Sequence, residues 1–260
     1  MKKLKNKTKL FLSMCSLGAS FLSKCFIGII FLYYYFADIF DLPFFQCVLH
    51  IKINGFVCRI IVRRISDFWV MKDDLLDREY DIETKDPKII IDLGANIGIS
   101  TLFFATKYPG GVIHAVEPNP DIYPDLSFNT SGFKNIKIYQ VAIAEKNGKI
   151  DLYTSKSGAS SSTLLRDSSD KHYIVDAITL DNFLKENGIK RVDVLKFDIE
   201  GAETVIFRSF DGFNKVRSYA GEIHYDLNDL TRKEIMEKAR NYSFKEKYLK
   251  KGRSILYLNS

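Results

Sequence analysis

The residues I-I-I-D-L-G-A-N-I-G, from Ile89 to Gly98, carry the strongest structural signal in this chain. Their isoleucines follow one another without polar residues between them, which indicates a strand buried on both faces, as in a parallel sheet covered by helices. The strand ends in an acid, Asp92, and Gly94 and Gly98 follow at the start of a predicted helix. Glycines and free helix N–H groups at the carboxyl edge of a sheet are typical of a nucleotide site.

Apolar runs of this kind alternate with helical patterns throughout residues 87–260, and we expect this range to form the main α/β domain. A helix is expected near 231–240, and Lys251-Gly252 indicates the turn of a terminal hairpin. The runs expected as strands are 88–93, 112–116, 136–141, 192–197, 219–224, 244–249 and 254–258.

The bulk composition fits one large domain with an extension. The chain has 260 residues, of which 46% are hydrophobic and 27% charged, values that exclude wholesale disorder and a polytopic membrane protein. The four cysteines all lie in the first quarter without a C-x-x-C pair, so neither a disulfide framework nor a structural zinc site is expected. The net charge of +6 resides at the two ends of the chain without a recognisable nucleic-acid motif, and no nucleic-acid partner is expected.

Two segments are expected to precede the main domain, an apolar helical extension at 1–40 and a hairpin with a helix at 41–86. Within 10–36 apolar residues recur at helical spacing opposite a stripe of serines, which predicts one amphipathic helix. Residues 48–62 predict a hairpin that turns at Asn54-Gly55, and Ser66 or Asp67 offers an N-cap for a short helix.

Glu117 stands directly after the expected strand 112–116, where an acid accepts hydrogen bonds from both hydroxyls of a ribose. A solvent-exposed loop acid is the alternative interpretation. Pro118 and Pro120 stiffen the following turn, which positions Asn119.

The glycine loop favours S-adenosylmethionine over a nicotinamide dinucleotide. A dinucleotide site usually shows G-x-G-x-x-G, which leaves room for a pyrophosphate, whereas here Ala95 and Asn96 fill the loop and Asp92 precedes it. Adenosylmethionine has an amino acid end and a sulfonium in place of phosphates, so acids and an asparagine suit it better. An NAD(P)-dependent oxidoreductase remains the alternative enzyme.

Five motifs in order resemble the FkbM-type methyltransferase family: D-L-G-A-N-I-G-I-S-T (92–101), A-V-E-P-N-P (115–120), T-L-D-N-F (179–183), L-K-F-D-I-E-G-A-E (195–203) and G-E-I-H (221–224). The resemblance covers about 67–227. It implies a class I methyltransferase, Rossmann-like fold with a mostly parallel seven-stranded sheet whose last strand is antiparallel. It also implies S-adenosylmethionine-dependent O-methylation of a hydroxyl on a small metabolite, sugar or glycan.

The cofactor residues follow from the same resemblance. It implies contacts to adenosylmethionine from Asp92, Gly94, Asn96, Gly98 and Glu117, with Ala142 beside the adenine. We extend this prediction to four neighbouring or nearby residues, Ala95, Pro118, Asn119 and Asp198.

A second group of polar residues is expected at the same edge of the sheet. Asp198 and Glu200 follow the strand 192–197, and Glu222 and His224 end the strand 219–224. We predict His224, Asp198 and Glu222 as catalytic residues, because methyl transfer needs an aligned acceptor oxygen and a group that takes its proton. His224, with an ordinary pKa near ~6.5, is a natural base, although lone histidines are often structural.

Other roles stay open for this group. Asp198, Glu200 and Glu222 are an alternative ligand set for a divalent metal that acidifies the acceptor hydroxyl. Glu203 suits the start of a helix, and Lys196 suits a salt bridge at the sheet edge as well as a functional role. The serine-rich stretch 155–169 is a candidate lid.

The lysine-rich start also resembles a signal peptide, but Lys24 and the serines interrupt the apolar segment. A lysine-rich N-terminus stays in the cytoplasm, so a single span would place the domain outside, away from a cytosolic cofactor. We therefore expect a cytoplasmic protein whose residues 1–37 pack on the domain or contact the membrane peripherally. A true span, and a membrane-associated binding protein without catalysis, are the remaining alternatives.

Overall fold

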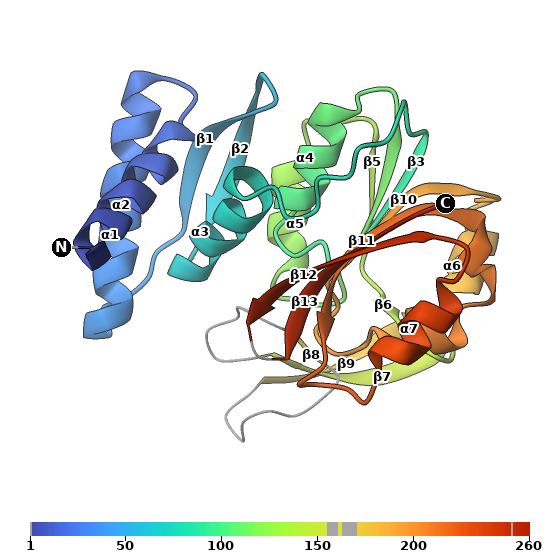
Figure 1. Ribbon diagram of the computed structural model, residues 1–260. Coiled ribbons are helices and arrows are strands. Elements are labelled where there is room, and N and C mark those ends of the chain that lie inside the picture. Colours follow the sequence, from blue (N-terminus) through green and yellow to red (C-terminus); the bar gives the residue numbers. More distant parts are fainter. Residues whose placement is uncertain (1, 155–160, 163–170, 251) are drawn as a thin grey trace.

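The computed structural model describes residues 2–154, 161–162, 171–250 and 252–260. Apart from Ser161 and Ser162, the segment 155–169 of the lid hypothesis lies outside these residues. Figure 1 shows a central sheet with helices on both faces, and an N-terminal extension that lies against one side of it.

The central sheet has seven strands in the order β12-β13-β11-β10-β3-β4-β5. The neighbours from β11 to β5 pair in parallel, whereas β13, the last strand of the chain, lies antiparallel between β11 and β12. The predicted seven-stranded sheet with an antiparallel last strand is therefore confirmed. The strands are β3 (Ile89–Leu93), β4 (Val112–Val116), β5 (Ile136–Tyr139), β10 (Val192–Phe197), β11 (Val216–His224), β12 (Ser243–Lys250) and β13 (Arg253–Asn259).

Alternate residues of the central strands enter two different cores, which explains the continuous apolar runs. Ile90 and Val194 pack on one face, and Ile91 and Leu195 pack on the other. The first face is covered by α4 (Ile99–Lys107) and α5 (Tyr123–Thr130). The second face is covered by α6 (Leu180–Glu186), α7 (Arg232–Lys238), η2 (Val205–Ser209) and η3 (Asp211–Lys215).

A smaller sheet, not expected from the sequence, adjoins the carboxyl edge of the main one. Its four strands have the order β6-β9-β7-β8. They are β6 (Ala142–Ile143), β7 (Gly148–Thr154), β8 (Ser161–Ser162) and β9 (Lys171–Ile178). The expected strand 136–141 therefore ends at Tyr139, and the chain passes into the second sheet.

The predicted hairpin is confirmed as β1 (Cys47–Ile53) and β2 (Phe56–Val62), which turn at Asn54-Gly55. It leads into α3 (Ile65–Met71) and η1 (Lys72–Leu76). The predicted N-cap is wrong by two to three positions, because α3 begins after Arg64. Asp67 instead accepts the backbone N–H groups of Arg63 and Arg64, which caps the first turn from within the helix.

The N-terminal segment is two helices, and the prediction of one helix through 10–36 is wrong. The helices α1 (Lys2–Ser16) and α2 (Phe21–Phe40) meet at a break where Gly18 bridges to Ile51 of β1. A Cβ at Gly18 would lie 2.5 Å from the backbone nitrogen of Lys24, so the break needs glycine. Buried residues of α2 join the core cluster that contains α4, and the extension thus shares a core with the main domain.

Candidate active site

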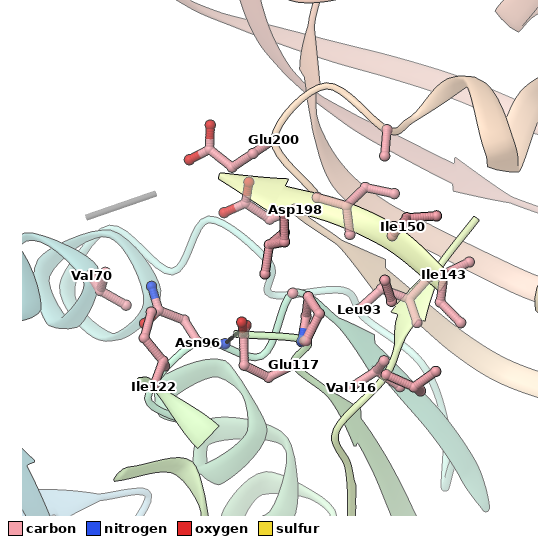
Figure 2. A pocket seen from close by; sticks show the side chains of 17 residues that line it. Val70, Leu93, Asn96, Val116, Glu117, Ile122, Ile143, Ile150, Asp198 and Glu200 are labelled. Carbon is pink, nitrogen blue, oxygen red and sulfur yellow. Dashed lines mark hydrogen bonds between the residues drawn. The ribbon is translucent and has the colours of Figure 1, made fainter. Parts of the chain in front are cut away.

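A pocket opens at the carboxyl ends of β3, β4 and β10, between the two sheets. Six of the predicted cofactor residues line it: Gly94, Asn96, Glu117, Pro118, Ala142 and Asp198. Figure 2 shows the Glu117 side chain beside the backbone nitrogen of Asn96, with Asp198 and Glu200 above them in this view. Four other predicted residues, Asp92, Ala95, Gly98 and Asn119, are buried or packed nearby and do not line the pocket.

Glu117 is the best-fixed acid of the pocket. Its side chain has two oxygens that each accept a backbone N–H at 2.9 Å, Oε2 from Asn96 and Oε1 from Asn119. Glu117 is only 5% exposed, which excludes the alternative interpretation that it is a solvent-exposed loop acid. Burial raises the pKa of Glu117 to about 7. Asn119 thus supports Glu117, and its own Oδ1 accepts the N–H of Asp121 in the turn.

The two glycines are required by contacts within the protein. A Cβ on Gly94 would lie 1.9 Å from the carbonyl oxygen of Asp198, so the loop can pass β10 only as glycine. A Cβ on Gly98 would lie 2.8 Å from Leu126 Cδ1, where α4 packs against α5. Both have positive φ, 72° and 90°. Gly94 also lines the pocket, whereas Gly98 does not.

Asp92 faces the interior of the domain. Its Oδ2 accepts hydrogen bonds from Ser100 and Thr101 of α4, and its Oδ1 lies 3.0 Å from Nζ of Lys196. Lys196 also donates to the carbonyl oxygen of Gly94 at 2.8 Å. Burial lowers the pKa of Lys196, but the surrounding carboxylates, Asp92 first, outweigh burial and raise it. The salt-bridge interpretation of Lys196 is confirmed, and this pair ties the glycine loop to β10 and α4.

The remaining wall of the pocket is apolar, and apart from Val141, which lies beside Ala142 in the loop expected near the adenine, the sequence analysis missed it. It comes partly from the second sheet, and β6 has only two residues, too few to give a periodic signal. The apolar residues of the wall are Val70, Leu93, Val116, Ile122, Val141, Ile143, Ile150, Leu152, Ile199 and Ala202.

The second polar group forms where β10 and β11 end side by side. Asp198 and Glu200 line the pocket, whereas Glu222 and His224 do not. Asp198 Oδ2 accepts the hydroxyl of Tyr80 at 3.1 Å, and its Oδ1 is buried without a hydrogen-bond partner in the described part of the chain. The structure thus brings the four predicted residues together, with two of them behind the pocket wall.

His224 is fully buried and pairs with the carboxylate of Glu203, a partner that the sequence analysis did not expect. Its Nδ1 lies 2.8 Å from Oε1 of Glu203, which is also fully buried. Burial lowers the pKa of His224, but the hydrogen bond to Glu203 and the nearby carboxylates outweigh burial and raise the pKa to about 9. Burial, with the charge of Asp198, raises the pKa of Glu222 to about 7. His224 is thus held by Glu203 and does not itself line the pocket.

Comparisons with known proteins found similar methyltransferases. The methyltransferase FkbM domain family matches residues 92–244. Methyltransferase sdnD of Sordaria araneosa is 27% identical over 58% of this chain and 71% of its own length. The 2-O-methyltransferase NoeI of Sinorhizobium fredii is 25% identical over 47% of this chain and 57% of its own. A solved methyltransferase FkbM from Methylobacillus flagellatus KT aligns with 99% of this chain and 60% of its own at 13% identity and a TM-score of 0.47.

The family match covers more than half of the chain, and it includes the glycine loop, Glu117 and the group around Asp198. The central sheet has the class I methyltransferase arrangement, with the last strand inserted antiparallel beside β11. The chain is a member of the FkbM family of methyltransferases.

Proposed function

We propose that this protein transfers a methyl group from S-adenosylmethionine to a hydroxyl oxygen on a small metabolite, sugar or glycan. Family membership supports the methyl transfer, and the name of the relative NoeI, a 2-O-methyltransferase, supports an oxygen acceptor. The observation that carries the proposal is Glu117, a carboxylate held by two backbone N–H groups at the end of β4 with its side chain lining the pocket.

The pocket residues fit this cofactor. A carboxylate has about four lone-pair sites, and the two N–H groups on Glu117 leave two for the hydroxyls of a ribose. Ala142, Ile143 and Leu152 offer an apolar surface suited to an adenine ring. Gly94 and Asn96 lie on the side that would receive the amino acid end. Asp92, Ala95, Gly98 and Asn119 act as positioning residues in this proposal, because they hold the loop and Glu117.

Asp198 is the group best placed to receive the proton of the acceptor. Adenosylmethionine supplies an activated methyl group on a sulfonium. Asp198 lines the pocket, and the buried Oδ1 lacks a hydrogen-bond partner within the described residues. We assign to it the binding and deprotonation of the acceptor hydroxyl, while Glu222 and His224 act through Asp198 from behind the pocket wall.

The test is a methylation assay with two cofactors compared. Purified protein incubated with a cell extract and methyl-labelled adenosylmethionine should yield a product 14 Da heavier than its precursor, as mass spectrometry detects. Isothermal titration should show binding of adenosylmethionine and not of NAD. Tighter binding of NAD would overturn the cofactor assignment in favour of an oxidoreductase, and binding without any product would favour the non-catalytic alternative.

We further propose that the protein is cytoplasmic and rests on anionic membrane through α2. One side of this helix packs into the core through Ile27, Phe31 and Tyr34, and Figure 1 shows α1 and α2 at the edge of the molecule, beyond the β1–β2 hairpin. The opposite side exposes 42–78% of each of eight large apolar residues, namely Phe21, Leu22, Phe26, Ile29, Leu32, Phe36, Ile39 and Phe40. Lys24 on α2 and Lys9 on α1 are also exposed, and lysines suit an anionic headgroup.

By length and composition α2 is also able to cross a membrane, with 20 residues and a mean hydropathy of 1.4. Crossing would remove Phe31 from its edge-to-face contacts with Phe68 and Trp69, and would expose the core beneath it. We therefore favour a helix that lies along the surface of the bilayer.

Vesicle flotation tests this orientation. Protein should float with phosphatidylglycerol vesicles, and much less with phosphatidylcholine vesicles. The double variant Ile29→Glu, Phe36→Glu should remain at the bottom, whereas Ile174→Glu, at a residue 65% exposed on β9, should behave as the wild type. Self-association without flotation would assign the apolar surface to a second copy of the chain, and resistance to carbonate extraction would indicate a span.

A further inference from the structure

We propose that Asp198, Glu200 and His224 bind one divalent cation beside the cofactor pocket, and that Glu203 orients His224 for this purpose. The three side chains each offer a ligand atom, and these atoms all lie within 4.8 Å of one another. They come from the end of β10, the turn that follows it and the end of β11, which is the parallel neighbour of β10. Binding of the cation is independent of the proposed methyl transfer, while its catalytic consequence rests on that function.

His224 points a second nitrogen into this group. Its side chain is 0% exposed, and Nε2 has no hydrogen-bond partner within the described residues. Nε2 lies 3.5 Å from Oε2 of Glu200 and 3.6 Å from Oε1 of Glu222, beyond hydrogen-bonding distance. A buried nitrogen without a hydrogen-bond partner, surrounded by carboxylate oxygens, is the arrangement expected of a metal ligand.

Glu203 provides the support that metal-binding histidines commonly have. A ligand histidine usually donates its other ring N–H to a carboxylate, which fixes the ring and leaves a lone pair for the metal. Here Oε1 of Glu203 lies 2.8 Å from Nδ1 of His224, and the carboxylate is itself held by the N–H of Gly201 at 3.0 Å and the amide of Asn228 at 2.6 Å. This chain of contacts fixes the ring while leaving Nε2 directed toward Asp198 and Glu200.

The carboxylates around His224 also favour the binding of a cation. Four carboxylates, those of Asp198, Glu200, Glu203 and Glu222, gather at one end of two strands. Arg253 lies 3.6 Å from Glu222, and the buried Lys196 acts electrostatically on Asp198, so these two cations offset part of this charge. A dication would bring further positive charge and would give the buried Oδ1 of Asp198 a partner, which it lacks within the described residues.

A second group of acidic residues differs from the proposed cation site. Asp73, Asp77 and Glu79 also lie within coordinating distance of one another. They are paired with lysines, however, since Lys72 lies 2.9 Å from Asp73 and 2.5 Å from Asp77. No histidine belongs to this group, so it serves as an internal control.

The ligand chemistry favours Mn²⁺ or Zn²⁺ over Ca²⁺. An imidazole suits zinc and other transition metals, and carboxylates suit manganese, so a mixed set points to these ions. Ligands on opposite sides of such an ion stand about 4 Å apart at bond lengths of about 2.1 Å. A separation of up to 4.8 Å therefore needs only a small closing movement, which Glu200, with 20% of its side chain exposed, can make.

The consequence for the proposed methyl transfer concerns the acceptor. Asp198 and Glu200 line the pocket, so a cation bound to them would face the acceptor hydroxyl. With a cation bound, Asp198 would act as its ligand in place of the proton acceptor. The cation would lower the pKa of the acceptor hydroxyl, whose proton would then leave to water. His224 would then be a ligand, and its predicted role as a base would be excluded.

The experiment measures Mn²⁺ binding to the full chain after EDTA treatment and dialysis. Electron paramagnetic resonance should show one tightly bound Mn²⁺ per chain, with an imidazole nitrogen signal in the pulsed spectrum. Asp198→Asn and His224→Gln should weaken binding at least 10-fold, and Glu203→Gln should weaken it about 10- to 100-fold. Asp77→Asn, in the control group of acids, should leave binding unchanged, and thermal unfolding should establish that each variant is folded.

Three results would overturn the proposal: no bound Mn²⁺, equal binding by the wild type and Asp198→Asn, or bound Mn²⁺ without the nitrogen signal. Titration of the same cation-free protein with adenosylmethionine separates this failure from a failure of the proposed function. Cofactor binding without Mn²⁺ binding rejects only the metal site. Mn²⁺ binding without cofactor binding rejects only the methyltransferase proposal.

Discussion

Replacing Glu117 by Gln tests the cofactor site at its most constrained residue. In the wild type each carboxylate oxygen accepts one backbone N–H, and two lone-pair sites remain for ribose hydroxyls. Glutamine keeps one oxygen, but its NH₂ group must face either the N–H of Asn96 or that of Asn119, and it offers no lone pair to the sugar. The variant thus loses the negative charge and at least one charge-assisted hydrogen bond to the cofactor.

The expected loss is about 1.5–3 kcal/mol, the usual contribution of a hydrogen bond to a charged group. At about 1.4 kcal/mol per factor of ten, the Kd for adenosylmethionine should rise about 10- to 150-fold. Isothermal titration at pH 8, where most Glu117 is ionised, measures this change. Urea denaturation measures separately how much the apposed N–H and NH₂ groups destabilise the fold.

The matched control is Glu186→Gln, which removes the same charge from an exposed position at the end of α6. Its Kd should equal that of the wild type. A folded Glu117→Gln variant that binds adenosylmethionine within twofold of the wild type would refute the assignment of Glu117 to the ribose.

Three further predictions concern Glu117, Gly98 and Lys196. Because the pKa of Glu117 is raised from 4.5 to about 7, the affinity for adenosylmethionine should increase from pH 6 to pH 8 as Glu117 ionises. Isothermal titration of Glu117→Gln should show no such increase. The same dependence on pH in both proteins would contradict this assignment. The contribution of Glu117 to folding has the opposite sign, being full below pH 4.5 and lost as the pH passes about 7. Gly98→Ala should lower the free energy of unfolding by about 1–3 kcal/mol, because the new Cβ would collide with Leu126. The control is Gly132→Ala, which should change the free energy of unfolding little, because no atom lies within 4 Å of a Cβ at that position. Similar urea midpoints for the two variants would argue against the α4–α5 contact. Lys196→Met should lower the free energy of unfolding by about 3–5 kcal/mol, because it leaves the buried Asp92 without its cationic partner. The double variant with Asp92→Asn should recover part of this loss. Strictly additive losses in a double-mutant cycle would reject the pairing.

The sequence was sufficient for the main sheet and for the edge at which the site lies. Strands buried on both faces are apolar throughout, so runs such as Ile89–Leu93 and Val192–Phe197 were visible without neighbours. Parallel strands bring their carboxyl ends to one edge, and for this reason Glu117, Asp198 and His224 could be expected near one another before any contact was known.

The direction in which each side chain points depended on contacts between distant segments. Asp92 turns inward because Lys196, on the neighbouring strand, and Ser100 and Thr101, on α4, surround it. Likewise, the second sheet and the break at Gly18 arise from pairings that local periodicity does not encode. Local pattern shows which residues form strands and loops, but whether an acid faces a cofactor, a lysine or a buried histidine depends on the partners that packing brings beside it.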